Sequence, residues 1–170
     1  MKGLLLAIDP GTFSSGWVLM KADSRQPLAC GKDPNEELLR DLSEGGAYWA
    51  EQVVIEMMTS YGARVGREVL ETCVWIGRFL QAAAANDMKV RTMYRRDVKL
   101  ELVETPKATD ADIRQMLVDR FAYGVPNLGK GTKSEPGWFY GFRADIWQAY
   151  ALGVAWTDRQ EREEVKHETD

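Results

Sequence analysis

Histidine and cysteine are scarce in this sequence of 170 residues, which contains one histidine, His167, and two cysteines, Cys30 and Cys73. A structural zinc site normally takes four such ligands, so the usual zinc-binding folds are excluded. Serine or cysteine nucleophiles normally need a histidine base, and His167 lies in a polar segment, Glu-Val-Lys-His-Glu, which we expect to be solvated. The side chains left for catalysis are carboxylates, lysines, arginines and tyrosines.

Long apolar runs are also absent. No run approaches the roughly 18 apolar residues that cross a bilayer. The apolar stretch at the start reaches Asp9 too soon for a signal peptide. We therefore expect a cytoplasmic protein that makes no membrane contact.

An excess of positive charge is missing as well, since the net charge is −4. A general polyanion binder would normally be basic. Charge is unevenly distributed, however, because residues 89–99 carry five basic side chains and one acidic side chain. Local charge governs such binding more than the sum does, so nucleic acid remains a possible partner.

Hydrophobic periodicity predicts one α/β domain over residues 1–157 and an acidic, polar, fraying tail over residues 158–170. The expected strands cover residues 4–8, 15–20, 27–31, 52–56 and 89–94. The expected helices cover residues 35–49, 65–85, 96–103, 109–122 and 143–157, and a long loop covers residues 123–141. This order predicts a mixed β-sheet flanked by α-helices.

Three carboxylates stand at unusual places in this pattern. Asp9 ends the first apolar strand, Glu56 ends the strand Val-Val-Ile, and Asp145 lies in the first turn of an apolar helix. If the two strands are neighbours and the helix crosses their ends, the three side chains converge. Convergent carboxylates repel one another, and a hard divalent cation such as Mg²⁺ or Mn²⁺ relieves that repulsion.

Each carboxylate also has a purely structural interpretation. Asp9 precedes Pro-Gly and suits a turn. Glu56 can emerge into water at the end of its strand, and Asp145 can be favoured by the dipole of its helix. Only the three residues together indicate a functional site.

The order of several motifs resembles that of the RuvC-type Holliday junction resolvases, members of the ribonuclease H-like superfamily. Leu-Leu-Ala-Ile-Asp-Pro-Gly-Thr at residues 5–12, followed by Gly16-Trp17, is similar to their opening, and Val-Ile-Glu56 is similar to their second motif. Their basic segment resembles residues 96–99, and their last motif resembles Asp145-Ile-Trp-Gln148. Residues 109–113 are similar to their following helix start, and residues 58–78 resemble a bacteriophage-type branch, which implies the host cytoplasm as the location.

The resemblance implies a ribonuclease H-like fold and metal-dependent hydrolysis of phosphodiester bonds. Asp9 would bridge two ions about 4 Å apart, and Glu56 and Asp145 would each hold one. Lys99 would neutralise charge on the scissile phosphate. Gln148 departs from the family pattern, because the family has a second helical acid at that position. Gln148 remains a candidate metal ligand, whereas Asp110 is either its substitute or, more simply, a helix cap.

Several side chains are candidates for contacts with DNA. Arginines can bind the phosphate backbone, and a tyrosine can stack on an unpaired base. Solvation for the arginines and core packing for the tyrosine are the competing interpretations. The candidates are Arg64, Arg67, Arg91, Arg95, Arg96 and Tyr61.

The sequence thus predicts a magnesium-dependent, structure-selective endonuclease that acts on four-way junctions, with three-way junctions and flaps as further candidate substrates. Symmetric cutting implies a homodimer, and the helix over residues 65–85, with Trp75 and Phe79, offers either a dimer face or an ordinary core face. A non-catalytic branched-DNA-binding module is the alternative. A phosphotransferase of the actin and sugar-kinase group also shares the Asp-Pro-Gly-Thr pattern, but it needs two such domains.

Overall fold

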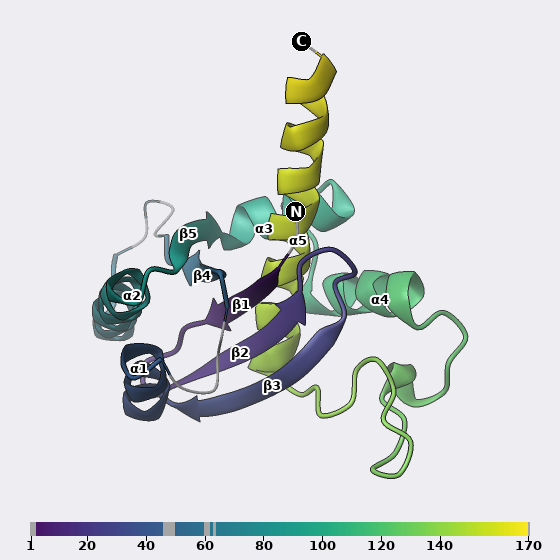
Figure 1. Cartoon of the computed structure of the whole chain (residues 1–170), viewed down its shortest axis with the longest axis horizontal. Helices are drawn as coiled ribbons and strands as arrows, with labels where there is room; N and C mark the ends of the chain where they lie inside the picture. Colours follow the sequence, from purple (N-terminus) through teal and green to yellow (C-terminus); the bar gives the residue numbers. More distant parts are fainter. Residues whose placement is uncertain (1–2, 46–49, 60–61, 63, 170) are drawn as a thin grey trace.

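Among the residues that the computed structural model describes (3–45, 50–59, 62 and 64–169), five strands form one mixed sheet in the order β3-β2-β1-β4-β5 (Figure 1). The strands are β1 (Leu4–Asp9), β2 (Ser14–Lys21), β3 (Pro27–Pro34), β4 (Gln52–Met57) and β5 (Lys89–Tyr94). The first three strands form an antiparallel meander, and β1 and β5 each run parallel to β4. The predicted mixed sheet is confirmed.

The helices divide between the two faces of this sheet. They are α1 (Asn35–Ser43), α2 (Arg67–Ala85), α3 (Arg95–Val103), α4 (Asp110–Phe121) and α5 (Asp145–Thr169). Alternate residues of the central strands bury their side chains on opposite faces, as the twofold period of a strand requires. Leu6 and Ile8 pack toward α1 and α2, whereas Leu5 and Ala7 pack toward α5.

The long helix α2 buries a face that overlaps only in part with the one that the sequence predicts. The expected apolar set contained Val69, Cys73, Ile76, Leu80 and Ala83. The buried residues are Thr72, Ile76, Phe79 and Ala83. Leu70 and Val74 are exposed, so this helix also presents apolar side chains to solvent.

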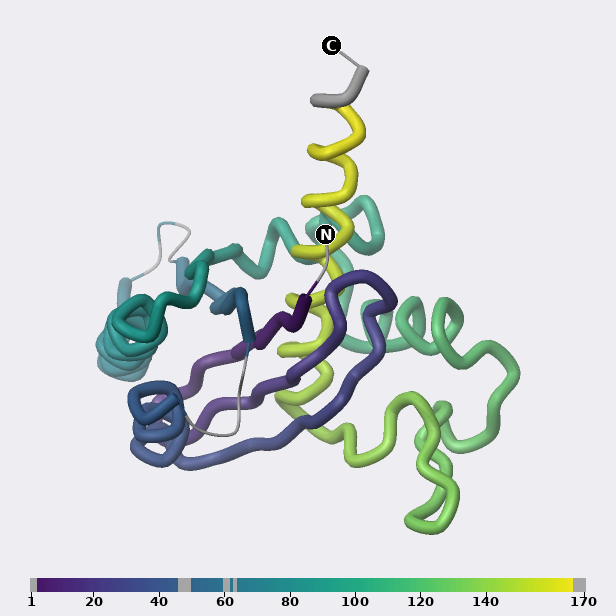
Figure 2. The backbone as a smooth tube through the Cα atoms, in the orientation of Figure 1, coloured from purple at the N-terminus to yellow at the C-terminus, as the bar shows by residue number. Residues whose placement is uncertain are grey.

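Helix α5 is apolar on nearly all sides over its first three turns, which explains why it is buried between the sheet and α3 and α4. The expected tail differs from the structure, because α5 continues past residue 157 to Thr169 (Figure 2). Asp158 accepts hydrogen bonds from Arg25 and Arg120, and Glu161 pairs with Arg25. These ion pairs extend the helix beyond its apolar part.

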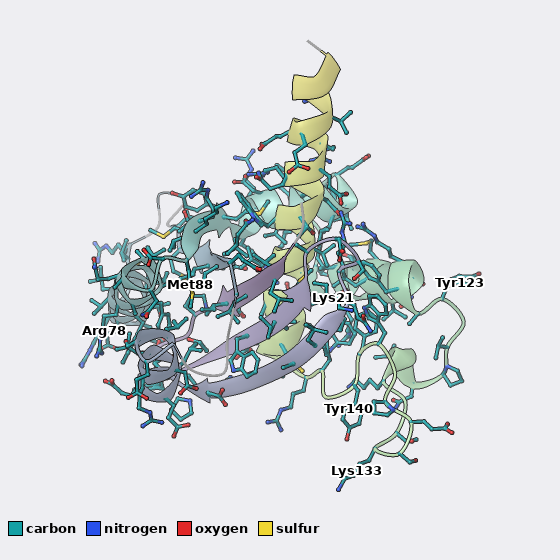
Figure 3. The ribbon with its side chains drawn as sticks, in the orientation of Figure 1. Lys21, Arg78, Met88, Tyr123, Lys133 and Tyr140 are labelled. Carbon is teal, nitrogen blue, oxygen red and sulfur yellow. The ribbon has the colours of Figure 1, made fainter. Side chains whose placement is uncertain are left out.

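The glycine-rich segment between α4 and α5 forms the expected loop, with one short 3₁₀ turn at Asn127–Gly129. Figure 3 shows Tyr123, Lys133 and Tyr140 along this segment, which projects from the body of the protein. The end of the loop returns to the core, where Phe139 and Phe142 lie against Tyr150 with ring centroids 5.7 and 5.2 Å away. This aromatic cluster fixes the start of α5.

Two expectations fall partly or wholly outside the described residues. The first helix was expected to reach residue 49, but α1 ends at Ser43, and residues 46–49 are not described. Tyr61 is likewise not described. Within the described ranges, no helix is both long enough and apolar enough to cross a membrane.

Candidate active site

The strand register brings Asp9 and Glu56 to the same edge and the same face of the sheet. Ala7 lies beside Val54 and Ile8 lies beside Ile55 in the parallel β1–β4 pair. Asp9 and Glu56 follow at the next step of that register. Ala7 and Val54 both face α5, so side chains two residues later face α5 as well.

Asp145 reaches this place because α5 begins directly against β2. Gly16 in β2 lies opposite Asp9 in the register of the β1–β2 pair. A Cβ atom at Gly16 would lie 2.8 Å from the carbonyl carbon, the carbonyl oxygen and the Cβ of Asp145. Only a glycine admits the start of the helix at this distance.

The three carboxylates line one open pocket of about 490 Å³. The predicted convergence is therefore present, although it is formed by a larger polar set than expected. The side chains around the pocket are Asp9, Glu56, Arg95, Asp110, Ala111, Arg114, Ala144, Asp145, Trp147 and Gln148.

Two cationic side chains neutralise part of the negative charge. Arg95 donates from Nη1 to Oε2 of Glu56 at 3.2 Å, and its Nη2 donates to Asp110 and to Gln148. Lys32 on β3 forms an ion pair with Asp145. Asp9, by contrast, accepts no side-chain hydrogen bond within the described part of the chain.

The electrostatics of the pocket are those of crowded carboxylates. Burial raises the pKa of Asp9 well above its ordinary value, and the charges of Glu56 and Asp145 raise it further. Burial also raises the pKa of Glu56, against the opposing effect of the Arg95 charge. The folded chain therefore concentrates negative charge where it is poorly solvated, and a bound cation would relieve that cost.

The donor set fits a hard divalent cation in its chemistry, since carboxylate and amide oxygens are the ligands that Mg²⁺ and Mn²⁺ prefer. Within the described ranges, however, no group of three or more His, Cys, Asp or Glu side chains is spaced to hold a metal ion. In the structure, Glu56 is paired with Arg95, and Asp145 is paired with Lys32. Occupation of the site by a metal ion requires these side chains to give way.

The other predicted residues lie in different settings. Lys99 is not among the side chains around the pocket, but its charge lowers the pKa of Glu56. Arg64, Arg91 and Arg96 are exposed, and Arg67 pairs with Glu71 on its own helix at 2.6 Å. Arg95 was expected to contact DNA, but the structure places it inside the acidic pocket.

The sequence analysis missed Lys32 and Arg114. Arg114 follows Asp110 by one helical turn, so the helical spacing carried a signal for it. Lys32 lies on an edge strand among exposed residues, and nothing in its local sequence indicates that α5 begins beside it.

No family model and no curated protein matches the sequence. Solved structures do match it. Thermus thermophilus RuvC superposes with a TM-score of 0.68 at 16% identity, over 94% of this chain and 96% of that one. The chain has the RuvC fold. T. thermophilus RuvC in complex with Holliday junction substrate gives a TM-score of 0.66 at 15% identity, over 95% of this chain and 96% of that one.

The RuvC fold extends to a eukaryotic neighbour. The yeast mitochondrial Holliday junction resolvase Ydc2 gives a TM-score of 0.63 at 12% identity, over 96% of this chain and 80% of that one. These likenesses span β1 to α5, so the sheet order and the helix that carries Asp145 belong to the shared fold. The predicted ribonuclease H-like architecture is confirmed.

Proposed function

We propose that this protein is a divalent-metal-dependent, structure-selective endodeoxyribonuclease that resolves Holliday junctions and other branched DNA. The observation that carries the proposal is the meeting of Asp9, Glu56 and Asp145, from three separate elements, in one pocket of a RuvC fold. A neighbour with this fold is described in complex with Holliday junction substrate, which supports branched DNA as the substrate class.

Asp9, Glu56 and Asp145, with the amide oxygen of Gln148, would hold Mg²⁺ or Mn²⁺, with two ions per site. Such ions supply an activated water and stabilise the leaving 3′ oxygen. Asp9 would help to hold both ions, because β1 lies between β4, which carries Glu56, and β2, against which Asp145 and the start of α5 lie. Lys99 lies close enough to act electrostatically on Glu56, and we assign it the neutralisation of the scissile phosphate.

Exposed arginines provide the proposed contacts with the DNA backbone. Arg64, Arg91 and Arg96 are exposed, as is Arg67 beside Glu71. Arginine side chains on phosphates position the duplex without reading its sequence. Tyr61 stays a prediction for base stacking, and assignment to a bacteriophage-type branch in the host cytoplasm stays a prediction as well.

The direct test is a cleavage panel with four-way, three-way, flap and linear duplex DNA. We expect the purified protein to cut branched DNA with Mg²⁺ or Mn²⁺ and to be inactive in EDTA. Cleavage in EDTA, or no cleavage of any branched substrate with either metal, would contradict the proposal. Tight binding of junctions without cutting would instead support a non-catalytic module, and ATP binding in calorimetry would support a phosphotransferase.

A homodimer follows from the proposed symmetric cutting, because two strands need two active sites. Phe79 is fully buried in the core of the protomer, so for this residue the core face is the interpretation that holds. The exposed side of α2 carries Leu70 and Val74, which are 58% and 63% exposed. We propose this side as the contact between protomers.

Val74→Asp is expected to weaken the dimer at least ~10-fold, because a charge buried in an apolar contact loses its hydration. Analytical ultracentrifugation over a concentration series measures the change. Val165→Asp is the matched control, since Val165 is also 63% exposed but lies on α5. A wild-type monomer at all concentrations, or equal effects of both substitutions, would rule out this contact.

A further inference from the structure

Asp110 lies at the start of α4 without capping that helix. The cap is Thr109, whose hydroxyl oxygen accepts a hydrogen bond from the Asp112 N–H at 3.2 Å. Asp112 completes the capping box, because its Oδ2 accepts from the Thr109 N–H at 2.7 Å. The simpler explanation of Asp110 as a helix cap is therefore wrong, and its carboxylate is left for another role.

That carboxylate faces the acidic pocket. Asp110 lies among the side chains around the pocket and forms an ion pair with Arg95. The same guanidinium reaches Glu56 from Nη1 and Gln148 from Nη2. One planar group thus joins oxygen atoms of three side chains, so a single guanidinium bridges Asp110 and Glu56.

The charge of Asp110 acts on the two carboxylates that the strands supply. It raises the pKa of Asp9 and the pKa of Glu56. Gln148, one helical turn after Asp145, offers an oxygen atom but no charge. The pocket therefore has a fourth negative charge, but this charge comes from α4 and not from α5.

The carboxylate of Asp9 is a second observation that points to a cation as the ligand of the pocket. The Asp9 side chain lines the pocket and is only partly exposed to solvent. Within the described residues, no hydrogen bond to the Asp9 carboxylate is formed. Arg95, by contrast, pairs with Glu56 and Asp110, and Lys32 pairs with Asp145. A poorly solvated carboxylate without a donor is the group that a divalent cation would satisfy.

We infer that Asp110 supplies the fourth carboxylate of the cation site, in place of the acid that Gln148 does not provide. The inference rests on the proposed function. Asp9, Glu56, Asp145 and Asp110 carry four negative charges, which two divalent cations balance. In the structure, Arg95 and Lys32 balance part of this charge, and Asp110 would exchange its ion pair with Arg95 for the cation.

Calorimetric titration of the full chain with MnCl₂ or MgCl₂, without DNA, tests this assignment. Asp110→Asn is expected to weaken Mn²⁺ binding ~10-fold, because affinity in all-oxygen sites follows the number of charged ligands. Asp112→Asn removes the same charge two residues away, outside the pocket, and is expected to keep the wild-type affinity. In the double variant D110N/Q148E, the charge returns on α5, and most of the affinity should return with it.

The outcomes separate this inference from the proposed function. Wild-type protein that binds no divalent cation would overturn both. Wild-type binding that Asp110→Asn leaves unchanged, or that Asp110→Asn and Asp112→Asn weaken equally, would overturn the role of Asp110 alone. Thermal unfolding confirms that each variant is folded, which we expect because the Asp110 side chain is 63% exposed.

Discussion

Asp9→Asn is expected to abolish cleavage of four-way junctions, with a loss of at least ~10³-fold. The substitution keeps the shape of the side chain but removes one of the negative charges that line the pocket. Metal ions supply several kcal/mol of transition-state stabilisation, and each 1.4 kcal/mol corresponds to about a tenfold change in rate. Single-turnover cleavage with saturating Mg²⁺ measures the loss.

The same substitution is expected to make the metal-free protein more stable at neutral pH. Burial and the neighbouring carboxylates raise the pKa of Asp9 in the folded state above its value in the unfolded chain. The stability that Asp9 contributes is thus present below its unfolded pKa and is lost as the pH rises through its folded pKa. Asparagine is neutral at every pH. The difference in free energy of unfolding between Asp9→Asn and the wild type therefore grows as the pH rises from the unfolded to the folded pKa of Asp9, and it is constant above the folded pKa.

Thermal unfolding in EDTA from pH 4 to pH 8 measures this difference. Asp119→Asn is the control, because Asp119 is an exposed acid on α4 whose carboxylate accepts a hydrogen bond from Gln115 on its own helix. The control should follow the wild-type pH profile and keep full cleavage. An Asp9→Asn protein that cuts normally, or that unfolds at a lower temperature than the wild type at pH 8, would contradict the account of the pocket.

The convergence of Asp9 and Glu56 was predictable because strands obey a strict twofold alternation. Two parallel strands that both end in an acid after three or more apolar residues place those acids at one edge. For Asp145, the sequence predicts only the kind of environment. An apolar helix with one acid in its first turn is expected to direct that acid toward a polar site. The remaining condition is that β1 and β4 are neighbours, and the strand order of the sheet meets it.

The partners of these acids were not predictable from local pattern. Five basic side chains stand between Lys89 and Lys99, and only the exact start of α3 decides that Arg95 points into the pocket. Asp110 and Asp112 occupy the same helical turn, and only side-chain geometry shows which of them completes the capping box with Thr109. Likewise, Arg25 anchors the continuation of α5 across 133 residues of sequence, so the charge of that segment alone suggested a tail.

Gly16→Ala tests whether the start of α5 is fixed by its contact with β2. The new methyl group would lie 2.8 Å from three atoms of Asp145, two of which belong to the backbone. Backbone cannot rotate away as a side chain can, so the first turn of α5 must move and take the Asp145 carboxylate with it. A shift of about 1 Å in a catalytic group can cost ~100-fold in rate. We therefore expect a ~100-fold loss of junction cleavage at a temperature where the variant is folded.

Gly153→Ala is the matched control in the same helix. Its methyl group would lie 2.6 Å from Sδ of Met20 and 3.2 Å from Cβ of Ala7, deep in the core and away from the pocket. The flexible end of Met20 can adjust, at a cost in stability that leaves Asp145 in place. Gly153→Ala should therefore lower the unfolding temperature while cleavage by the folded protein is retained. If the two variants lose cleavage equally, then general loss of packing, and not displacement of Asp145, explains the effect of Gly16.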